Sequence, residues 1–384
     1  MSADGSGSRR ARSVLLAGGG TAGHVSPLLA LADCLRREDP DVRITALGTE
    51  AGLESRLVPA RGYDLKFIPK VPLPRKPTGD LLRLPANLRK AIAAADTAIR
   101  ASGADVVVGF GGYVATPAYL AARRRGIPVV VHEQNARPGI ANRLGARLAA
   151  RVGVTFAGTP LPHSTVTGMP LRREIALLDR AALREKAMAH FGLDPQWPTV
   201  LVTGGSLGAL RINEAFRTSV AVLRAAGVQV LHVTGLGKDF EVPAPRGSEP
   251  PYVVLPYADR MDLAYAAVDF VVGRAGANTV CELTAVGLPA AYVPLPIGNG
   301  EQRFNVAGVI DAGGGLLVDD ADLTPEWVET TLLPLLRDSG RLADMARAAA
   351  SVGERDGDGK LAALVHEVAG RARSGDDSPG PRRD

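Results

Sequence analysis

The feature that most constrains this sequence is a short unit that recurs along the chain. An apolar run is followed by a glycine-rich turn and the start of a helix, beginning near residues 14, 106, 200 and 270. Repeated units of this kind build a parallel sheet whose turns gather at its carboxyl edge. A glycine-rich turn also leaves free backbone N–H groups at the positive end of a helix dipole, where phosphate binds.

The stretch 269–305 is the fullest example of this unit. It predicts in order a strand, a turn, a helix, a second strand and a second helix, at residues 270–272, 274–278, 279–286, 290–293 and from Glu301 onward. Glu282 follows the turn by about one helical turn, where its carboxylate could accept hydrogen bonds from a ribose diol. The alternative is an ordinary turn with a solvated Glu282.

Strands and helices alternate through the whole chain in two similar halves. In the first half we predict strands at residues 14–17, 42–47, 65–68, 106–110, 129–132 and 152–154. In the second half we predict strands at residues 200–203, 228–233, 252–255, 270–272, 290–293 and 315–318. Predicted helices include residues 27–37, 81–100, 117–125 and 360–373. The pattern predicts an α/β fold of two halves facing each other across a cleft.

Length and charge support two domains with different partners. A chain of 384 residues can bury two cores. Residues 1–172 hold 24 Lys and Arg against 12 Asp and Glu, whereas residues 173–384 hold 21 against 28. The first half is therefore basic and the second acidic, which indicates an anionic partner for the first half.

Several classes of protein are disfavoured by the sequence. No run of about 18 apolar residues is present, so we expect no membrane-spanning helix. The apolar run that follows the basic start is short and ends in glycines, which predicts a disordered leader before a first strand. Cys34 and Cys281 lie far apart in predicted helices, so we expect no disulfide and a reducing cytoplasm.

The first glycine turn contains a weak dinucleotide-binding pattern. Gly18, Gly20 and Gly23 match GxGxxG. The acid that the pattern requires at the end of the second strand is misplaced, since Glu50 lies beyond that strand, and this disfavours an NAD-dependent oxidoreductase. We expect His24 at the helix N-terminus, with Pro27 in the first turn, and a neutral imidazole able to take a proton. The alternative is a histidine that caps or packs.

Two more turns follow strands of the first half and should lie at the same sheet edge. They are residues 110–113 (FGGY) and 131–135 (VHEQN). Three converging turns make a site. Glu133 and Asn135 are candidates for substrate contacts, whereas we expect His132 to be a buried histidine at the end of its strand.

Residues 69–90 mix prolines, leucines and cations. The apolar members are Leu73, Leu81, Leu82, Leu84 and Leu88, and the cations are Arg75, Lys76, Arg83, Arg89 and Lys90. Such a segment suits a surface that dips into an anionic leaflet. The alternative is an ordinary amphipathic helix whose leucines face the core.

These turns together resemble glycosyltransferase family 28, the family of bacterial cell-wall N-acetylglucosaminyltransferases. The motifs that carry the resemblance are GGTAGH, FGGYVATPA, HEQNARPGIANR, GGSLGALRIN, PYADRM and RAGANTVCEL…GLPAAYVPLP…GEQRFN. The resemblance implies the GT-B architecture of two Rossmann-like domains. The implied boundaries are a leader at 1–12, an acceptor and membrane domain at 13–170, a UDP-sugar domain at 171–350, a helix at about 355–373 that packs back on the first domain, and a disordered tail at 374–384.

The same resemblance implies an activity. An inverting transferase would move N-acetylglucosamine from UDP-N-acetylglucosamine to the 4-hydroxyl of lipid I, undecaprenyl-diphospho-N-acetylmuramoyl-pentapeptide, giving lipid II for peptidoglycan. It would act peripherally at the cytoplasmic face of the cell membrane. No cofactor, metal or nucleic acid is expected, and cell-wall and division proteins are candidate partners. The aspartate pairs Asp320/Asp322 and Asp356/Asp358 are interpreted as solvated.

The resemblance also assigns residues to the two substrates. Those assigned to the donor are Thr21, Ala22, Gly23, Asn135, Arg172, Ser206, Ala258, Gly276, Ala277, Asn278, Thr279, Glu282, Gln302 and Asn305. Those assigned to the acceptor are Gly19, Gly20, Tyr113 and Glu133. Arg172 matches the family pattern, although a plain hinge residue is its alternative, and Met169 stands where the family has Asn.

The catalytic candidates are His24 and Glu133. A base must take the proton of the acceptor hydroxyl and be unprotonated near neutral pH. His24 fits this condition better, because an exposed carboxylate is a weak base. Two other functions remain open: a UDP-N-acetylglucosamine 2-epimerase, which would not need the basic apolar segment, and a non-catalytic membrane-recruitment subunit, which would not need His24 or Glu282.

Overall fold

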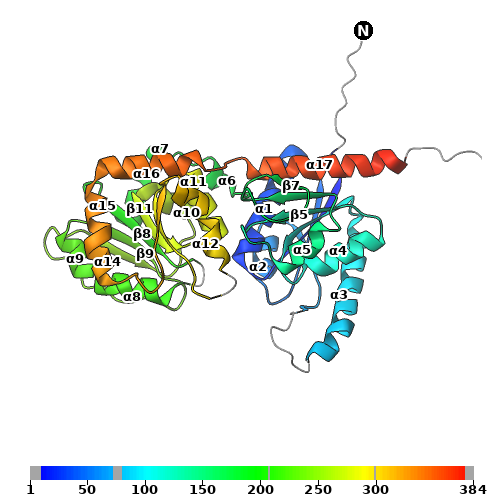
Figure 1. The fold of residues 1–384 in the computed structure, drawn as a ribbon, viewed down its shortest axis with the longest axis horizontal. Helices are drawn as coiled ribbons and strands as arrows, with labels where there is room; N and C mark the ends of the chain where they lie inside the picture. The colour runs from blue at the N-terminus through cyan, green and yellow to red at the C-terminus, as the bar shows by residue number, and fades with distance from the viewer. Residues whose placement is uncertain (1–9, 72–79, 206–207, 298–299, 377–384) are drawn as a thin grey trace, which may run out of the picture. The chain divides into compact units, whose positions relative to one another are not determined.

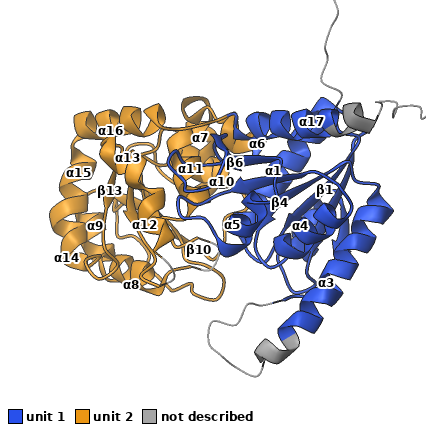
Figure 2. Cartoon of the chain, turned by 45° about the vertical axis from the view of Figure 1, so that its right-hand side comes forward, with its two compact units in different colours: residues 1–172, 356–384 blue, residues 173–355 orange. Residues whose placement is uncertain are grey.

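The chain folds into two compact units, each with its own parallel sheet (Figure 2). The computed structural model describes residues 10–71, 80–205, 208–297 and 300–376, without the side chains of 80–83 and 372–376. The first unit comprises residues 1–172 and 356–384, and the second comprises residues 173–355. The C-terminal segment therefore returns to the unit in which the chain begins.

The first unit contains a seven-stranded sheet with the order β3-β2-β1-β4-β5-β6-β7. Its strands are β1 (Ser13–Gly18), β2 (Arg43–Gly48), β3 (Asp64–Phe67), β4 (Val106–Gly111), β5 (Val129–Glu133), β6 (Arg151–Val154) and β7 (Ser164–Val166). Its helices are α1 (Ala22–Glu38), α2 (Glu54–Ala60), α3 (Asp80–Ser102), α4 (Ala115–Arg124), α5 (Ile140–Ala146) and α17 (Gly357–Asp376). All neighbouring strands pair in parallel, so the turns that follow them share one edge.

Helices cover both faces of this sheet because its strands are apolar on both sides (Figure 1). Along β1, Val14 and Leu16 belong to one buried cluster, whereas Leu15 and Ala17 belong to the other. Side chains of α1 and α17 complete the first cluster, and those of α3 and α4 complete the second. Successive side chains of a strand point to opposite faces, so this alternation produces the three layers of a Rossmann-like domain.

The second unit repeats this design with a six-stranded sheet of order β10-β9-β8-β11-β12-β13. Its strands are β8 (Thr199–Thr203), β9 (Gln229–Val233), β10 (Tyr252–Leu255), β11 (Phe270–Arg274), β12 (Ala290–Val293) and β13 (Gly315–Leu317). Its helical segments are α6 (Arg173–Ala176), α7 (Arg180–Phe191), α8 (Leu210–Thr218), α9 (Val220–Ala225), α10 (Met261–Ala267), α11 (Ala277–Ala285), α12 (Glu301–Asn305), α13 (Ala307–Asp311), α14 (Pro325–Trp327), the π-helix η1 (Val328–Leu332), α15 (Leu333–Arg337) and α16 (Ser339–Ser351).

The predicted strands are all present, and the structure adds β7, whose three residues are exposed and form no apolar run. Three other expectations about the elements are wrong. Helix α1 begins at Ala22, so Pro27 lies inside the helix and not in its first turn. Helix α17 continues to Asp376, three residues into the predicted tail, because extending an existing helix costs little.

The predicted leader is also too long by at least two residues. Ala11 is fully buried, and its N–H donates to His366 Nδ1 of α17 over 3.2 Å. The N–H groups of Arg12 and Ser13 both donate to Asp105 Oδ2 over 2.9 Å. These contacts come from residues distant in the sequence, so the composition of the leader could not reveal them. In the described residues, none of the helices has the length and apolar character needed to cross a bilayer.

We predict that Gly109→Ala destabilises the first unit. An added Cβ at this position in β4 would overlap the ring of Tyr119, which is fully buried and cannot move without displacing the core. Overpacking of this kind costs about 1–3 kcal/mol. The measurement is the free energy of unfolding in urea. Gly308→Ala in α13 is the control, because no atom lies near its added Cβ, and a free energy equal in the two variants would contradict the prediction.

Candidate functional site

The first glycine turn, between β1 and α1, is held by a buried carboxylate that the sequence analysis missed. Glu54 is fully buried at the start of α2. Its Oε2 accepts the N–H of Gly20 over 2.9 Å, and its Oε1 accepts the N–H and hydroxyl of Thr49 over 2.8 and 3.0 Å. Glu50 lies beyond β2, as expected, and is exposed. The acid near this turn therefore binds the protein's own backbone and leaves no free carboxylate for a dinucleotide ribose.

His24 lies in the first turn of α1, partly exposed, with its Nδ1 3.1 Å from the hydroxyl of Thr21. Desolvation lowers the pKa of His24, while the negative charge of Glu54 and a hydrogen bond with the backbone of Gly19 oppose that shift less strongly. The imidazole is therefore neutral near pH 7, as expected, although burial is the main cause. The FGGY turn packs against it, because an added Cβ at Gly111 would lie 3.3 Å from its Nε2.

Glu133 ends β5 and is buried, which contradicts the expectation of an exposed carboxylate. Its Oε1 accepts the N–H of Asn135 over 2.9 Å, and its Oε2 accepts the N–H of Gly139 and the Nδ2 of Asn142, both over 3.0 Å. Burial raises the pKa of Glu133, and these hydrogen bonds counteract the shift. These three hydrogen bonds hold residues 133–142 around the carboxylate, and this segment covers it.

The remaining predicted residues of the first unit differ in exposure. Tyr113 has 42% of its surface exposed, and Lys70 Nζ lies 5.3 Å from the centre of its ring. His132 is fully buried, as expected, and its Nε2 lies 3.0 Å from the carbonyl oxygen of Gly168. Burial lowers the pKa of His132 to about 4. Met169 is buried as well, whereas Arg172 is half-buried at the end of this unit.

In the second unit, the RAGAN turn leads directly from β11 into α11. The helix begins at Ala277 with Gly276 as its N-cap, so Ala277, Asn278 and Thr279 form its first turn. Glu282 is only 9% exposed and accepts the hydroxyl of Tyr265 over 2.8 Å. The alternative of a solvated Glu282 is therefore wrong.

The other donor candidates of this unit lie on neighbouring turns. Gln302 accepts the N–H of Leu295 over 2.9 Å, and buried Asn305 contacts the carbonyl oxygen of Ala275 over 3.4 Å. The Asn305 contact therefore connects the turns after β11 and β12, whereas the Gln302 hydrogen bond lies within the segment after β12. Ala258 is buried, and Ser206 lies outside the described residues.

Two of the four aspartates predicted to be solvated are not. Asp320 lies between Arg274 and Arg211, and Asp358 pairs with Arg37 over 2.8 Å. Asp322 and Asp356 are exposed. Within the described residues, no three His, Cys, Asp or Glu side chains come together as a metal site.

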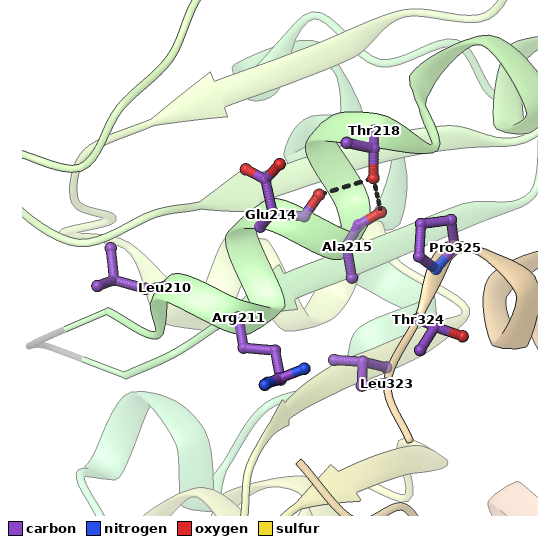
Figure 3. A pocket seen from close by; sticks show the side chains of 8 residues that line it. All are labelled: Leu210, Arg211, Glu214, Ala215, Thr218, Leu323, Thr324 and Pro325. Atoms are coloured by element: carbon purple, nitrogen blue, oxygen red, sulfur yellow. Dashed lines mark hydrogen bonds between the residues drawn. The ribbon is translucent and has the colours of Figure 1, made fainter. Parts of the chain in front are cut away.

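A cavity of about 540 Å³ lies between α8 and residues 323–325 (Figure 3). The eight residues that line it are Leu210, Arg211, Glu214, Ala215, Thr218, Leu323, Thr324 and Pro325. Most of its wall is apolar, and none of the eight was assigned to a substrate.

Comparison with known proteins shows which family this chain belongs to. The chain matches the Glycosyltransferase family 28 N-terminal domain over residues 14–154 and the C-terminal domain over residues 199–361. Over 361 residues, 94% of this chain and 99% of the relative, it is 59% identical to the UDP-N-acetylglucosamine--N-acetylmuramyl-(pentapeptide) pyrophosphoryl-undecaprenol N-acetylglucosamine transferase of Streptomyces avermitilis. The chain belongs to glycosyltransferase family 28.

Solved structures agree with family 28 membership. MurG of Acinetobacter baumannii has a TM-score of 0.73 at 29% identity, covering 92% of this chain and 99% of that one. The calicheamicin glycosyltransferase CalG4 has a TM-score of 0.64 at 19% identity, with 94% and 99% covered, and so shows the fold alone. The predicted GT-B architecture of two Rossmann-like domains is confirmed, while the cleft between them stays a prediction.

We predict that Glu54→Gln destabilises the first unit of this family 28 protein. A Gln side chain has the same size but turns one acceptor into a donor, so it leaves a buried N–H of Gly20 or Thr49 without a partner. Such a loss costs about 1–3 kcal/mol. Urea unfolding would measure it. Glu50→Gln is the control, because it removes a charge from an exposed side chain four residues earlier. An equal loss of unfolding free energy in that control would exclude the unpaired buried N–H group as the cause.

Proposed function

We propose that this protein transfers N-acetylglucosamine from UDP-N-acetylglucosamine to the 4-hydroxyl of lipid I and so makes lipid II for peptidoglycan. The observation that carries the proposal is the 59% identity to a transferase of that name over nearly the full length of both chains. The site supports it, because both units present glycine-rich turns at the carboxyl edges of parallel sheets. No cofactor or metal is needed for this reaction.

The second unit is proposed to bind the donor. The first turn of α11 offers backbone N–H groups to the diphosphate, and buried Glu282 offers a carboxylate oxygen to the ribose. Gln302 and Asn305 come from the neighbouring turn and would bind hydroxyl groups of the sugar. Hydrogen bonds to the leaving diphosphate stabilise the negative charge that grows on it in the transition state.

The first unit is proposed to bind the acceptor. His24, neutral near pH 7, takes the proton of the acceptor hydroxyl as its oxygen attacks the anomeric carbon. The new carbon–oxygen bond forms on the face opposite the diphosphate, the bond to the diphosphate oxygen breaks, and UDP leaves with the electron pair. Both oxygens of Glu133 already accept hydrogen bonds from the protein, which favours His24 for this role.

The first unit is also proposed to bind the cytoplasmic face of the cell membrane, where lipid I would be held by its lipid tail. Arg89 and Lys90 on α3 are exposed. Leu84 and Leu88 pack partly against the core, as the amphipathic-helix alternative predicted for them. Leu73, Arg75 and Lys76 lie outside the described residues, and the side chains of Leu81, Leu82 and Arg83 are not described.

The proposed function is tested by incubating the protein with UDP-N-acetylglucosamine and a short-chain lipid I analogue. Release of UDP together with formation of the disaccharide product supports it. An epimerase would instead interconvert the UDP-sugar without acceptor, and a recruitment subunit would leave both compounds unchanged. Either result would overturn the proposal.

We predict that His24→Ala lowers kcat by about 10²–10⁴ while the affinity for UDP stays nearly unchanged. The pKa of His24 lies below the ordinary value of 6.5, so kcat of the unmodified enzyme should fall only as the pH drops through that lower value and the imidazole gains its proton. This acidic limb should be absent in the variant. His190→Ala, at an exposed histidine of α7, is the control. A variant that keeps both kcat and the acidic limb would exclude His24 as the base.

We predict that Arg89→Gln/Lys90→Gln weakens binding to anionic vesicles by about 1 kcal/mol per residue. Both cations are exposed, and each attracts an anionic surface. Co-sedimentation with phosphatidylglycerol vesicles measures the effect, while transfer to a short soluble acceptor should persist. The exposed pair Arg337→Gln/Arg341→Gln on the second unit removes the same charge, and equal weakening by that pair would show that net charge alone is responsible.

A further inference from the structure

Asp320 follows β13 at the carboxyl edge of the second sheet. Its Oδ1 lies 2.6 Å from Nη1 of Arg274, and its Oδ2 lies 3.1 Å from Nε of Arg211. The Asp320 side chain is 15% exposed, so water screens these contacts little. One carboxylate thus joins two cations from two other segments.

Arg274 is the last residue of β11 and immediately precedes the turn proposed to hold the donor. Its Nη1 also donates to the carbonyl oxygens of Val293, the last residue of β12, and of Pro294, which follows it, each over 3.2 Å. Its side chain is 12% exposed, and its Nε has no hydrogen-bond partner. A guanidinium buried in this way needs a nearby negative charge, and Asp320 provides it.

Arg211 lies in the first turn of α8, directly after the GGSLGA turn that follows β8. Its side chain extends from α8 toward the segment that contains Leu323 (Figure 3). This side chain is 52% exposed, so its ion pair with Asp320 is the weaker of the two in the bridge formed by Arg274, Asp320 and Arg211. In the sheet order β8-β11-β12-β13, the bridge therefore connects segments that follow all four strands.

We propose that Asp320 is a positioning residue for the donor, acting through Arg274 and Arg211. Without touching the donor, it fixes the spacing of the segments after β8, β11 and β12, whose backbone groups would bind the UDP diphosphate and sugar. The inference rests on the proposed function. A misplacement of about 1 Å in such groups is enough to cost substantial affinity or rate.

The test compares Asp320→Asn with Asp322→Asn. Both remove one negative charge from the same loop without changing side-chain size, but Asp322 is exposed and forms no ion pair among those described. We expect Asp320→Asn to raise the Kd for UDP, measured by calorimetry on folded protein, by about tenfold or more, a size typical of a lost charged contact. The KM for UDP-N-acetylglucosamine should rise with it, and the KM for the acceptor should stay within about twofold. Asp322→Asn should change neither.

Two further variants separate positioning from simple stability. Asp320→Glu keeps the charge and should restore part of the lost UDP affinity. Arg211→Gln removes only the exposed ion pair and keeps Asp320 paired with Arg274. This variant replaces Asp320→Asn as the test if Asp320→Asn does not fold. We expect Arg211→Gln to raise the Kd for UDP by about threefold or more. A purely structural role would instead lower the active fraction and the melting temperature with the Kd for UDP unchanged in the folded protein, and that result overturns the proposal.

The unmodified protein distinguishes a failure of this inference from a failure of the proposed function. If it binds UDP but does not glycosylate the lipid I analogue, the proposed function fails, and the calorimetric comparison still decides the role of Asp320. If it glycosylates the analogue and Asp320→Asn binds UDP as tightly as Asp322→Asn does, only the inference fails. An unmodified protein that binds no UDP overturns both.

Discussion

Buried carboxylates at the carboxyl edges of the two sheets hold the turns on which the site depends. A glycine-rich turn places several backbone N–H groups close together, and those that face the protein interior need an acceptor. Glu54 and Glu133 accept such groups in the first unit, where Glu54 joins the turns after β1 and β2 and Glu133 organises the turn after β5. Asp320 has a related task in the second unit, although it acts through two guanidinium groups.

This arrangement explains which parts of the molecule the sequence could reveal. Apolar runs, glycine turns and helix starts are local signals, so all predicted strands and the GT-B architecture are present in the structure. The hydrogen bonds of Glu54 and the ion pairs of Asp320 instead join residues that are far apart in the sequence. Glu54 contacts Gly20 across 34 positions, and no periodic pattern reports such a pair. The ion pairs of Asp320 escape prediction for the same reason, since its two partners precede it by 46 and 109 positions.

The environment of His24 shows how a correct expectation can have a different cause. The helix N-terminus suggested a neutral imidazole through the dipole of α1, whereas desolvation is the main reason for the lowered pKa. Glu54 opposes this shift, so the acid that holds the glycine turn also acts on the pKa of the histidine. Both influences bear on the proposed role of His24, because a pKa too far below the working pH weakens proton transfer.

The first unit depends on both ends of the chain, which sets a limit on how the protein can fold. Leu361 and Val365 of α17 are fully buried in the same cluster as Val14 and Leu16 of β1. Burying two such side chains contributes about 3–6 kcal/mol, a large share of the net stability of a domain. The second unit has its own core in one continuous segment, residues 173–355, and is in effect inserted into the first. The first unit can therefore complete its core only after the second unit has been synthesised.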